Sequence, residues 1–114
     1  MKRDETVYLR HILDAIAKTQ VYLATVDEVS FHANSLVQDG VIRQIEIIGE
    51  ATKRLSSELR QKHADIPWED IAGMRDKLIH NYFGVDLDKV WVTAKEELPV
   101  LKEAVEKILS NLLG

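Results

Sequence analysis

The chain contains no cysteine, which excludes a disulfide scaffold, a thiolate metal site and a cysteine nucleophile. Five glycines and two prolines give few turn signals, and no internal repeat or interdomain linker is visible. No apolar run approaches the roughly 18 residues that a membrane-spanning helix needs. The charged first residues are also unlike a signal peptide, so we expect a cytoplasmic protein with no membrane partner.

Positive charge is not in excess either. Fifteen Lys and Arg residues stand against nineteen Asp and Glu, for a formal net charge of −4. This balance argues against a protein that coats nucleic acid through bulk charge, but it is compatible with a small local nucleic-acid site. A chain of 114 residues, 46% hydrophobic and 30% charged, is typical of one globular domain, which we expect to span residues 1–114.

The apolar residues follow a helical spacing almost throughout, and no segment alternates with period two. The predicted helices cover about residues 4–26, 41–59, 67 to 80 or 82, and 87–112, with Asp86 capping the last. The polar stretch 30–39 indicates a connection or a break. Pro99 predicts a kink, because proline removes one backbone hydrogen bond. The pattern predicts an all-α fold, an up-and-down four-helix bundle with a short third helix and a fourth helix kinked at Pro99.

One segment combines a cation, a carboxylate, an imidazole and a phenol: Arg75, Asp76, His80 and Tyr82. A guanidinium binds phosphate oxygens, and a histidine can exchange a proton with a ribose hydroxyl, so these groups suit phosphodiester cleavage without a metal. Asp76 lies four residues before His80 and could accept a hydrogen bond from its ring. On a regular helix His80 lies about 140° round from Arg75. Either the helix loosens, or a second copy of the chain completes the site.

The structural alternative for this segment is a helix end at which Arg75 is solvated and His80 caps carbonyl groups. Arginine and histidine five residues apart are common, so the spacing alone does not decide between the two interpretations. His11, His32 and His63 are scattered, and we interpret them as surface residues rather than metal ligands. The sequence thus predicts no metal site and no cofactor.

A set of short motifs surrounds this segment in a fixed order: IGEATKRL at 48–55, IPW at 66–68, IAGMR at 71–75, HNY at 80–82, VD at 85–86, VW at 90–91 and LP at 98–99. The set includes an intact R-x-x-x-x-H-x-Y pattern with a polar residue directly after the arginine. Over roughly residues 5–110 the chain resembles the HepT-like branch of the HEPN superfamily. Several ordered motifs make this resemblance specific.

The resemblance implies a homodimeric four-helix bundle that acts as a metal-independent endoribonuclease, the toxin of a two-gene toxin–antitoxin module. It implies that Arg75 holds the scissile phosphate, that His80 is the general acid or base, and that Asp76 orients or tunes them. These groups would meet in a cleft at the dimer interface and leave a 2′,3′-cyclic phosphate. The antitoxin of such modules is a minimal nucleotidyltransferase that adds AMP to the motif tyrosine, here Tyr82.

Four basic residues are candidates for RNA binding, with a solvated helix face as the alternative: Arg43, Lys53, Arg54 and Lys77. Dimerisation is also expected because the third helix would leave apolar residues partly unburied in a monomer, namely Met74, Leu78 and Tyr82. Two other functions stay open. The chain could be a non-catalytic helical partner that docks a nucleotidyltransferase and presents Tyr82, or a plain dimerisation module.

Overall fold

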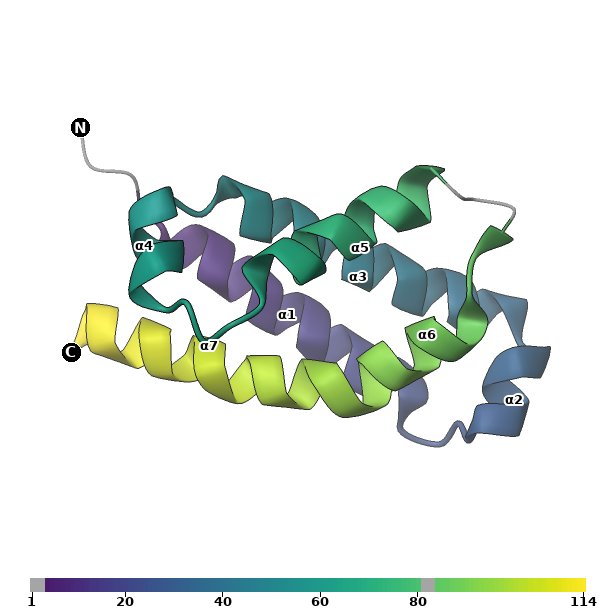
Figure 1. The fold of residues 1–114 in the computed structure, drawn as a ribbon. Helices are drawn as coiled ribbons and strands as arrows, with labels where there is room; N and C mark the ends of the chain where they lie inside the picture. Colours follow the sequence, from purple (N-terminus) through teal and green to yellow (C-terminus); the bar gives the residue numbers. More distant parts are fainter. Residues whose placement is uncertain (1–3, 81–83) are drawn as a thin grey trace.

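The computed structural model describes residues 4–80 and 84–114, and the regular structure in these ranges is entirely helical (Figure 1). The all-α prediction is therefore confirmed. None of the described helices combines the length and the apolar character needed to cross a membrane. The elements, in chain order, are α1 (Thr6–Leu23), α2 (Glu28–Ala33), α3 (Ser35–Arg54), α4 (Ser57–Lys62), α5 (Trp68–His80), α6 (Leu87–Val92), the π-helical turn η2 (Thr93–Glu97) and α7 (Leu98–Leu113).

The long helices pack side by side, with α1 between α3 and α7 and with α5 on a further face of α3. Successive long segments run in opposite directions, so that the start of α1 and the end of α7 lie at the same end of the molecule (Figure 1). One buried apolar core joins these helices, because each presents a stripe at three- and four-residue steps. Fully buried members include Leu9, Ile12, Ile16, Phe31, Val41, Ile48 and Val105.

The polar stretch 30–39 is helical, apart from a single break at Asn34. Asp27 accepts a hydrogen bond from the Ser30 backbone N–H at 2.8 Å and caps α2. Asn34 accepts one from the Val37 N–H at 3.1 Å and caps α3. Short polar side chains satisfy the free N–H groups at a helix start, so these residues begin helices here instead of forming a loop. The predicted break is thus confirmed at Asn34, whereas the rest of the stretch is helical and not a longer connection.

The second predicted helix is divided. α3 ends at Arg54, and Ser56 caps α4 by accepting from the Leu59 backbone N–H at 3.1 Å. The Ser56 backbone N–H and hydroxyl also donate to the Glu5 carboxylate, at 2.6 and 2.9 Å. Leu59 is still buried, although it belongs to a separate helix, so the apolar spacing predicted its burial and missed the break.

Pro99 lies in the first turn of α7, directly after the π-helical turn η2. A π turn widens the helix locally and leaves room where a proline ring would collide with the preceding turn. The segment from Leu87 to Leu113 thus stays helical through Pro99. The irregularity that proline imposes is located in the five residues before α7.

Candidate functional site

Helix α5 carries most of the predicted site residues, and its first residue anchors it. The Trp68 side chain is buried, and its indole N–H donates to the His63 carbonyl oxygen at 3.0 Å. Glu69 and Asp70 follow in the first turn, where negative charge is favourable for the helix dipole. Leu78 is the other buried residue of α5. This helix is therefore fixed near both ends, with its polar residues between the two anchors.

Gly49 of α3 allows α5 to approach closely at Arg75. A Cβ atom at position 49 would lie 2.2 Å from the Arg75 Cβ and 3.3 Å from the Ile71 carbonyl oxygen. Two carbon atoms that are not bonded to each other do not come as close as this Cβ would to that of Arg75. No larger residue therefore fits at position 49 unless α5 moves. A glycine inside a helix costs about 0.5–1 kcal/mol relative to alanine. The close approach of the two helices at Gly49 places the base of the Arg75 side chain against α3.

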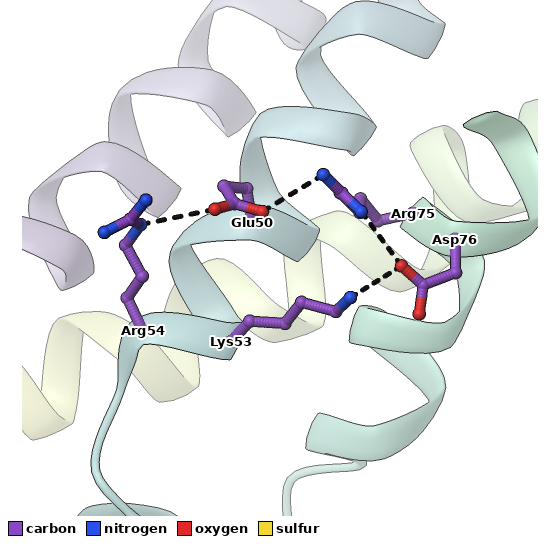
Figure 2. Close-up of polar contacts among 5 residues, drawn as sticks. All are labelled: Glu50, Lys53, Arg54, Arg75 and Asp76. Atoms are coloured by element: carbon purple, nitrogen blue, oxygen red, sulfur yellow. Dashed lines mark hydrogen bonds and ion pairs between the residues drawn. The ribbon is translucent and has the colours of Figure 1, made fainter.

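Figure 2 shows five residues of α3 and α5 that form what we call the charged cluster: Glu50, Lys53, Arg54, Arg75 and Asp76. The Arg75 guanidinium bridges two carboxylates, with Nη2 at 3.3 Å from Glu50 Oε2 and Nη1 at 3.0 Å from Asp76 Oδ1. Lys53 Nζ lies 2.6 Å from the same Asp76 oxygen, and Arg54 Nε lies 3.3 Å from Glu50 Oε1. The cluster therefore holds three cations and two carboxylates in one continuous chain of ion pairs.

The charged cluster orients its members more than it stabilises the fold. The Arg75 side chain is 28% exposed and that of Asp76 is 42% exposed, and ion pairs with this much water contact contribute about 0–1 kcal/mol each. Hydrogen bonds from Lys53 and then Arg75 hold the pKa of the Asp76 carboxyl below its usual 3.8. Asp76 is therefore ionised at neutral pH and keeps the Arg75 guanidinium in place.

His80 is the last residue of α5, and its side chain is exposed. The structure describes no hydrogen bond between Asp76 and His80, since Asp76 Oδ1 accepts from Lys53 and Arg75 instead. The Asp76–His80 contact that the sequence allows is thus not formed within the described residues, where Lys53 of α3, far away in sequence, binds the same carboxylate. Tyr82 lies outside the described residues.

Arg75 also lines a pocket of about 380 Å³ between α1, α3 and α5. Of the other predicted RNA-binding residues, Arg43 and Arg54 line this pocket, whereas Lys53 and Lys77 do not. The full lining is Tyr8, His11, Arg43, Glu46, Ile47, Glu50, Ala51, Arg54, Arg75 and Ile79. The structure thus brings together Arg43, Arg54 and Arg75, and it leaves His80 and Lys77 outside this pocket.

Sequence reasoning missed three residues near Arg75. Glu50 lies four residues before Arg54, and this spacing favours an ion pair on a helix, so it could have predicted the contact from the sequence. Tyr8 and His11 had no local signal, because only the packing of α1 against α3 brings them to the pocket. Their rings lie 6.3 Å apart between centroids and meet edge to face.

The sequence profile of the Ribonuclease HepT-like family matches residues 12–108. This chain belongs to the HepT-like ribonuclease family. Its relatives include a protein of Methanocaldococcus jannaschii named gamma-glutamylcyclotransferase and, provisionally, RNase, which is 46% identical over 112 residues. That alignment covers 98% of this chain and 50% of the relative, so the chain spans half the length of that protein.

Two further relatives match along nearly their whole length. A second protein of M. jannaschii, provisionally named an RNase, is 43% identical over 111 residues, covering 97% of this chain and 96% of the relative. A protein of Thermococcus cleftensis, provisionally named ribonuclease HepT, is 43% identical over 108 residues, covering 95% and 98%. No solved structure matches the chain. Membership of the HepT-like family and these relatives support a ribonuclease-type function.

One apolar residue of α5 is more buried in this HepT-like chain than the sequence predicts, and another is partly exposed as expected. Leu78 is only 6% exposed, so the expectation of an unburied Leu78 in a monomer was wrong. Met74 is partly buried, and its sulfur accepts from the Thr93 hydroxyl at 3.5 Å. The third residue of that set, Tyr82, lies outside the described residues. Ile79, at 42% exposure, is the large apolar side chain that α5 leaves open.

One group of described residues places metal-ligating atoms close together, at the opposite end of α3 from the charged cluster. Ligand atoms of Glu28, His32 and Asp88 lie within 4.8 Å of one another, and all three residues are exposed. His32 Nδ1 lies 2.8 Å from the Glu28 carbonyl oxygen, and Nε2 lies 2.7 Å from Asp88 Oδ1. These hydrogen bonds, that to the Glu28 carbonyl foremost, raise the pKa of His32 above 6.5. Both ring nitrogens are thus already engaged by oxygen atoms.

Proposed function

We propose that this HepT-like chain is a metal-independent endoribonuclease toxin of a two-gene toxin–antitoxin module, acting in the cytoplasm as a homodimer. Each copy would be a single HEPN-type domain with the four long helical segments as its bundle. The observation that carries the proposal is the Arg75 guanidinium, which two carboxylates hold in place at the edge of a pocket, in a chain of a ribonuclease family.

Arg75 is suited to a phosphate because it is fixed and only partly exposed. Its guanidinium can present two parallel N–H donors to phosphate oxygens, and such donors stabilise the charge that develops in the transition state. Asp76 is a positioning residue here: it accepts from Arg75 at 3.0 Å and keeps that side chain oriented. Glu50 pairs with the other side of the guanidinium, and an incoming phosphate would replace Glu50 there.

His80 supplies proton transfer in this proposal. As general base it takes the proton from a ribose 2′-OH, and the 2′ oxygen forms a bond to phosphorus. The bond from phosphorus to the 5′ oxygen breaks, and that oxygen receives a proton from a protonated histidine. The products are a 2′,3′-cyclic phosphate and a 5′-hydroxyl. Every atom is accounted for by the RNA and the histidine, so the route needs no redox partner and no co-reactant.

The direction of the His80 side chain is the reason for proposing that a second copy of the chain completes the site. α5 is continuous from Trp68 to His80, so the helix does not loosen between Arg75 and His80. On such a helix the two side chains lie about 140° apart. We therefore favour a site in which Arg75 of one copy acts with His80 of the partner subunit across a two-fold axis.

Silencing by a nucleotidyltransferase antitoxin is the remaining part of the proposal, and it rests on the family motif. The Tyr82 phenol oxygen would bond to the α-phosphorus of ATP, with pyrophosphate as the leaving group and the phenol proton passing to a base on the transferase. The attached phosphate brings negative charge seven residues from Arg75. That charge would compete for the guanidinium and repel the phosphate of a substrate.

The test is a gel assay of cellular RNA with purified protein in excess chelator, beside a His80→Ala variant. We expect cleavage by the wild type and a loss of about 10²–10⁴-fold in rate for the variant. Mass spectrometry establishes beforehand that Tyr82 is unmodified. Lys18→Ala, an exposed change on α1 away from the pocket, is the matched control and should cut RNA at the wild-type rate.

Equal cleavage by the wild type and His80→Ala would disprove the role of His80. Intact RNA with unmodified wild-type protein would disprove the nuclease proposal and favour the second candidate, a non-catalytic partner that presents Tyr82 to a nucleotidyltransferase. The exposed His80, without a polar contact among the described residues, is the observation that keeps this candidate open. Under it, His80→Ala should weaken binding of the transferase.

A further inference from the structure

The pocket beside Arg75 is built from one stripe of each of three helices. α1 contributes Tyr8 and His11, α3 contributes residues 43, 47, 50 and 54, and α5 contributes Arg75 and Ile79. Each set follows the three- and four-residue steps of one helix face. A volume of about 380 Å³ falls within the roughly 300–1,000 Å³ of small-molecule pockets. The pocket can therefore receive one compact molecular unit.

The charges of the pocket favour an anionic ligand. Three arginines line it, Arg43, Arg54 and Arg75, together with two glutamates, Glu46 and Glu50. Glu50 already pairs with Arg54 and Arg75, at 3.3 Å in each case. Arg43 is exposed, and within the described residues it forms no ion pair. Arg43 is therefore the cation that a ligand phosphate can reach without displacing a protein carboxylate.

The remaining walls suit a flat ring. Two aromatic residues of α1, Tyr8 and His11, and two apolar residues, Ile47 and Ile79, belong to the lining. Aromatic side chains stack on nucleic-acid bases for about 1–3 kcal/mol each, with little dependence on sequence. Cations and aromatic rings in the lining of one pocket match a nucleotide, which carries a phosphate and a base on one sugar.

We infer that this pocket binds one nucleotide of the RNA substrate, with Arg43 on a phosphate and with His11 and Tyr8 against the base. The inference rests on the proposed ribonuclease function, because Arg75 belongs to both the pocket and the cleavage site. His11 and Arg43 are then RNA-binding residues that lie outside the 75–82 motif. They set where the strand lies relative to the scissile phosphate.

A second copy of this chain is the competing occupant. An apolar helix from another copy would bury Arg43, which forms no ion pair within the described residues, and burying a cation without a partner costs several kcal/mol. A nucleotide brings the compensating negative charge with it. The chemistry of the lining thus favours RNA over protein in this pocket.

The experiment measures binding separately from cleavage. A fluorescently labelled six-nucleotide 2′-O-methyl RNA, which lacks the attacking hydroxyl, is titrated with wild-type protein and with single variants. Arg43→Ala should weaken binding roughly tenfold, as expected for loss of a charged hydrogen bond. It should also lower the slope of log affinity against log salt by about 0.7, because one phosphate contact is lost. His11→Ala should weaken binding at least about fivefold through lost stacking.

Arg10→Ala is the matched control, since Arg10 is exposed on α1 beside His11 but does not line the pocket. It should leave affinity and salt slope unchanged. Amide NMR shifts on adding adenosine 3′-monophosphate should appear at residues 8, 11, 43, 47 and 79, which provides a readout that does not depend on a variant's stability.

Three results would overturn the inference. His11→Ala and Arg43→Ala could bind RNA as well as the wild type while Arg75→Ala does not. In that case RNA contacts Arg75 from outside the pocket, and the nuclease proposal stands. If either variant changes the oligomeric state in sedimentation analysis, a second copy occupies the pocket. If the wild type neither binds nor cuts RNA, the proposed function fails as well.

Discussion

The interface between α1 and α3 is made of side chains that exclude water, whereas α3 meets α5 through a glycine and a group of charges. On the α1 side, Ile12, Ile16 and Ile48 are at most 1% exposed. The buried hydroxyls of Thr19 and Thr52 donate to carbonyls of their own helices, at 2.9 and 2.8 Å. Both hydroxyls therefore have a hydrogen-bond partner within their own helix and need none from the neighbouring helix.

The α3–α5 interface is open by comparison. Only two residues of α5 are buried, and Gly49 replaces a side chain at the point of closest approach. Arg75 lies over that glycine and is held by ion pairs that stay in contact with water. This chain thus separates an interface that stabilises the fold by burial, between α1 and α3, from one that leaves Arg75 and Asp76 in contact with water, between α3 and α5. The following predictions test that separation.

The largest effect on stability should come from the α1 side. Ile16→Ala should lower the free energy of unfolding by about 2–5 kcal/mol, because it leaves a cavity in a fully buried site. Urea denaturation measures this change. Below the transition, RNA cleavage per folded molecule should equal that of the wild type. The exposed Val100→Ala is the control and should change stability by no more than about 0.5 kcal/mol.

Gly49→Ala should have the next largest effect, and it should affect both properties. The new Cβ would collide with the Arg75 Cβ, and overpacking of this kind costs about 1–3 kcal/mol. Because α5 must shift, RNA cleavage should fall further than the loss of folded protein explains. The measurement is the cleavage rate at a temperature where circular dichroism shows the variant fully folded.

Gly73→Ala is the matched control on α5, since a Cβ at that position meets nothing within 4 Å. It should stabilise the protein by up to about 1 kcal/mol through helix propensity and leave cleavage unchanged. Equal cleavage by Gly49→Ala and Gly73→Ala would contradict the idea that Gly49 sets the position of Arg75.

Acid should reveal a smaller contribution from the charged cluster. The pKa of Asp76 is lower in the folded protein than its usual 3.8, so its contribution to stability is present above that value. It should be lost as pH falls through the folded pKa. Asp76→Asn should therefore unfold with less dependence on pH below about 4. Urea midpoints measured from pH 5 to pH 2.5 test this, and parallel curves for the two proteins would contradict it.

The smallest effect should come from His32, away from both interfaces. Its pKa is raised above 6.5 in the folded protein, so its stabilising contribution is present below that value and is lost as pH rises through the folded pKa. Asp88→Asn should bring the NMR titration of the His32 ring back toward its ordinary range. An unchanged titration would show that Asp88 does not act on His32. RNA cleavage should not respond to this change.

The sequence by itself predicts the all-α class, the Asp86 cap and the buried stripe of α3, because these depend on spacing within one helix. It does not predict that Asp27, Asn34 and Ser56 begin new helices. A short polar residue suits a cap and a loop equally well, and the choice depends on whether the following residues find a core to pack against.

The 75–82 motif identifies Arg75 and Asp76 as neighbours, but only the tertiary structure decides what they bind. Lys53 pairs with Asp76, which the sequence offers as a possible partner of His80, and Glu50 pairs with the Arg75 guanidinium. His11 joins the pocket from α1, some 64 residues before Arg75 in the sequence. Contacts within one helix follow from residue spacing, whereas contacts between helices depend on how closely they pack. At the charged cluster that packing is set by the missing side chain of Gly49.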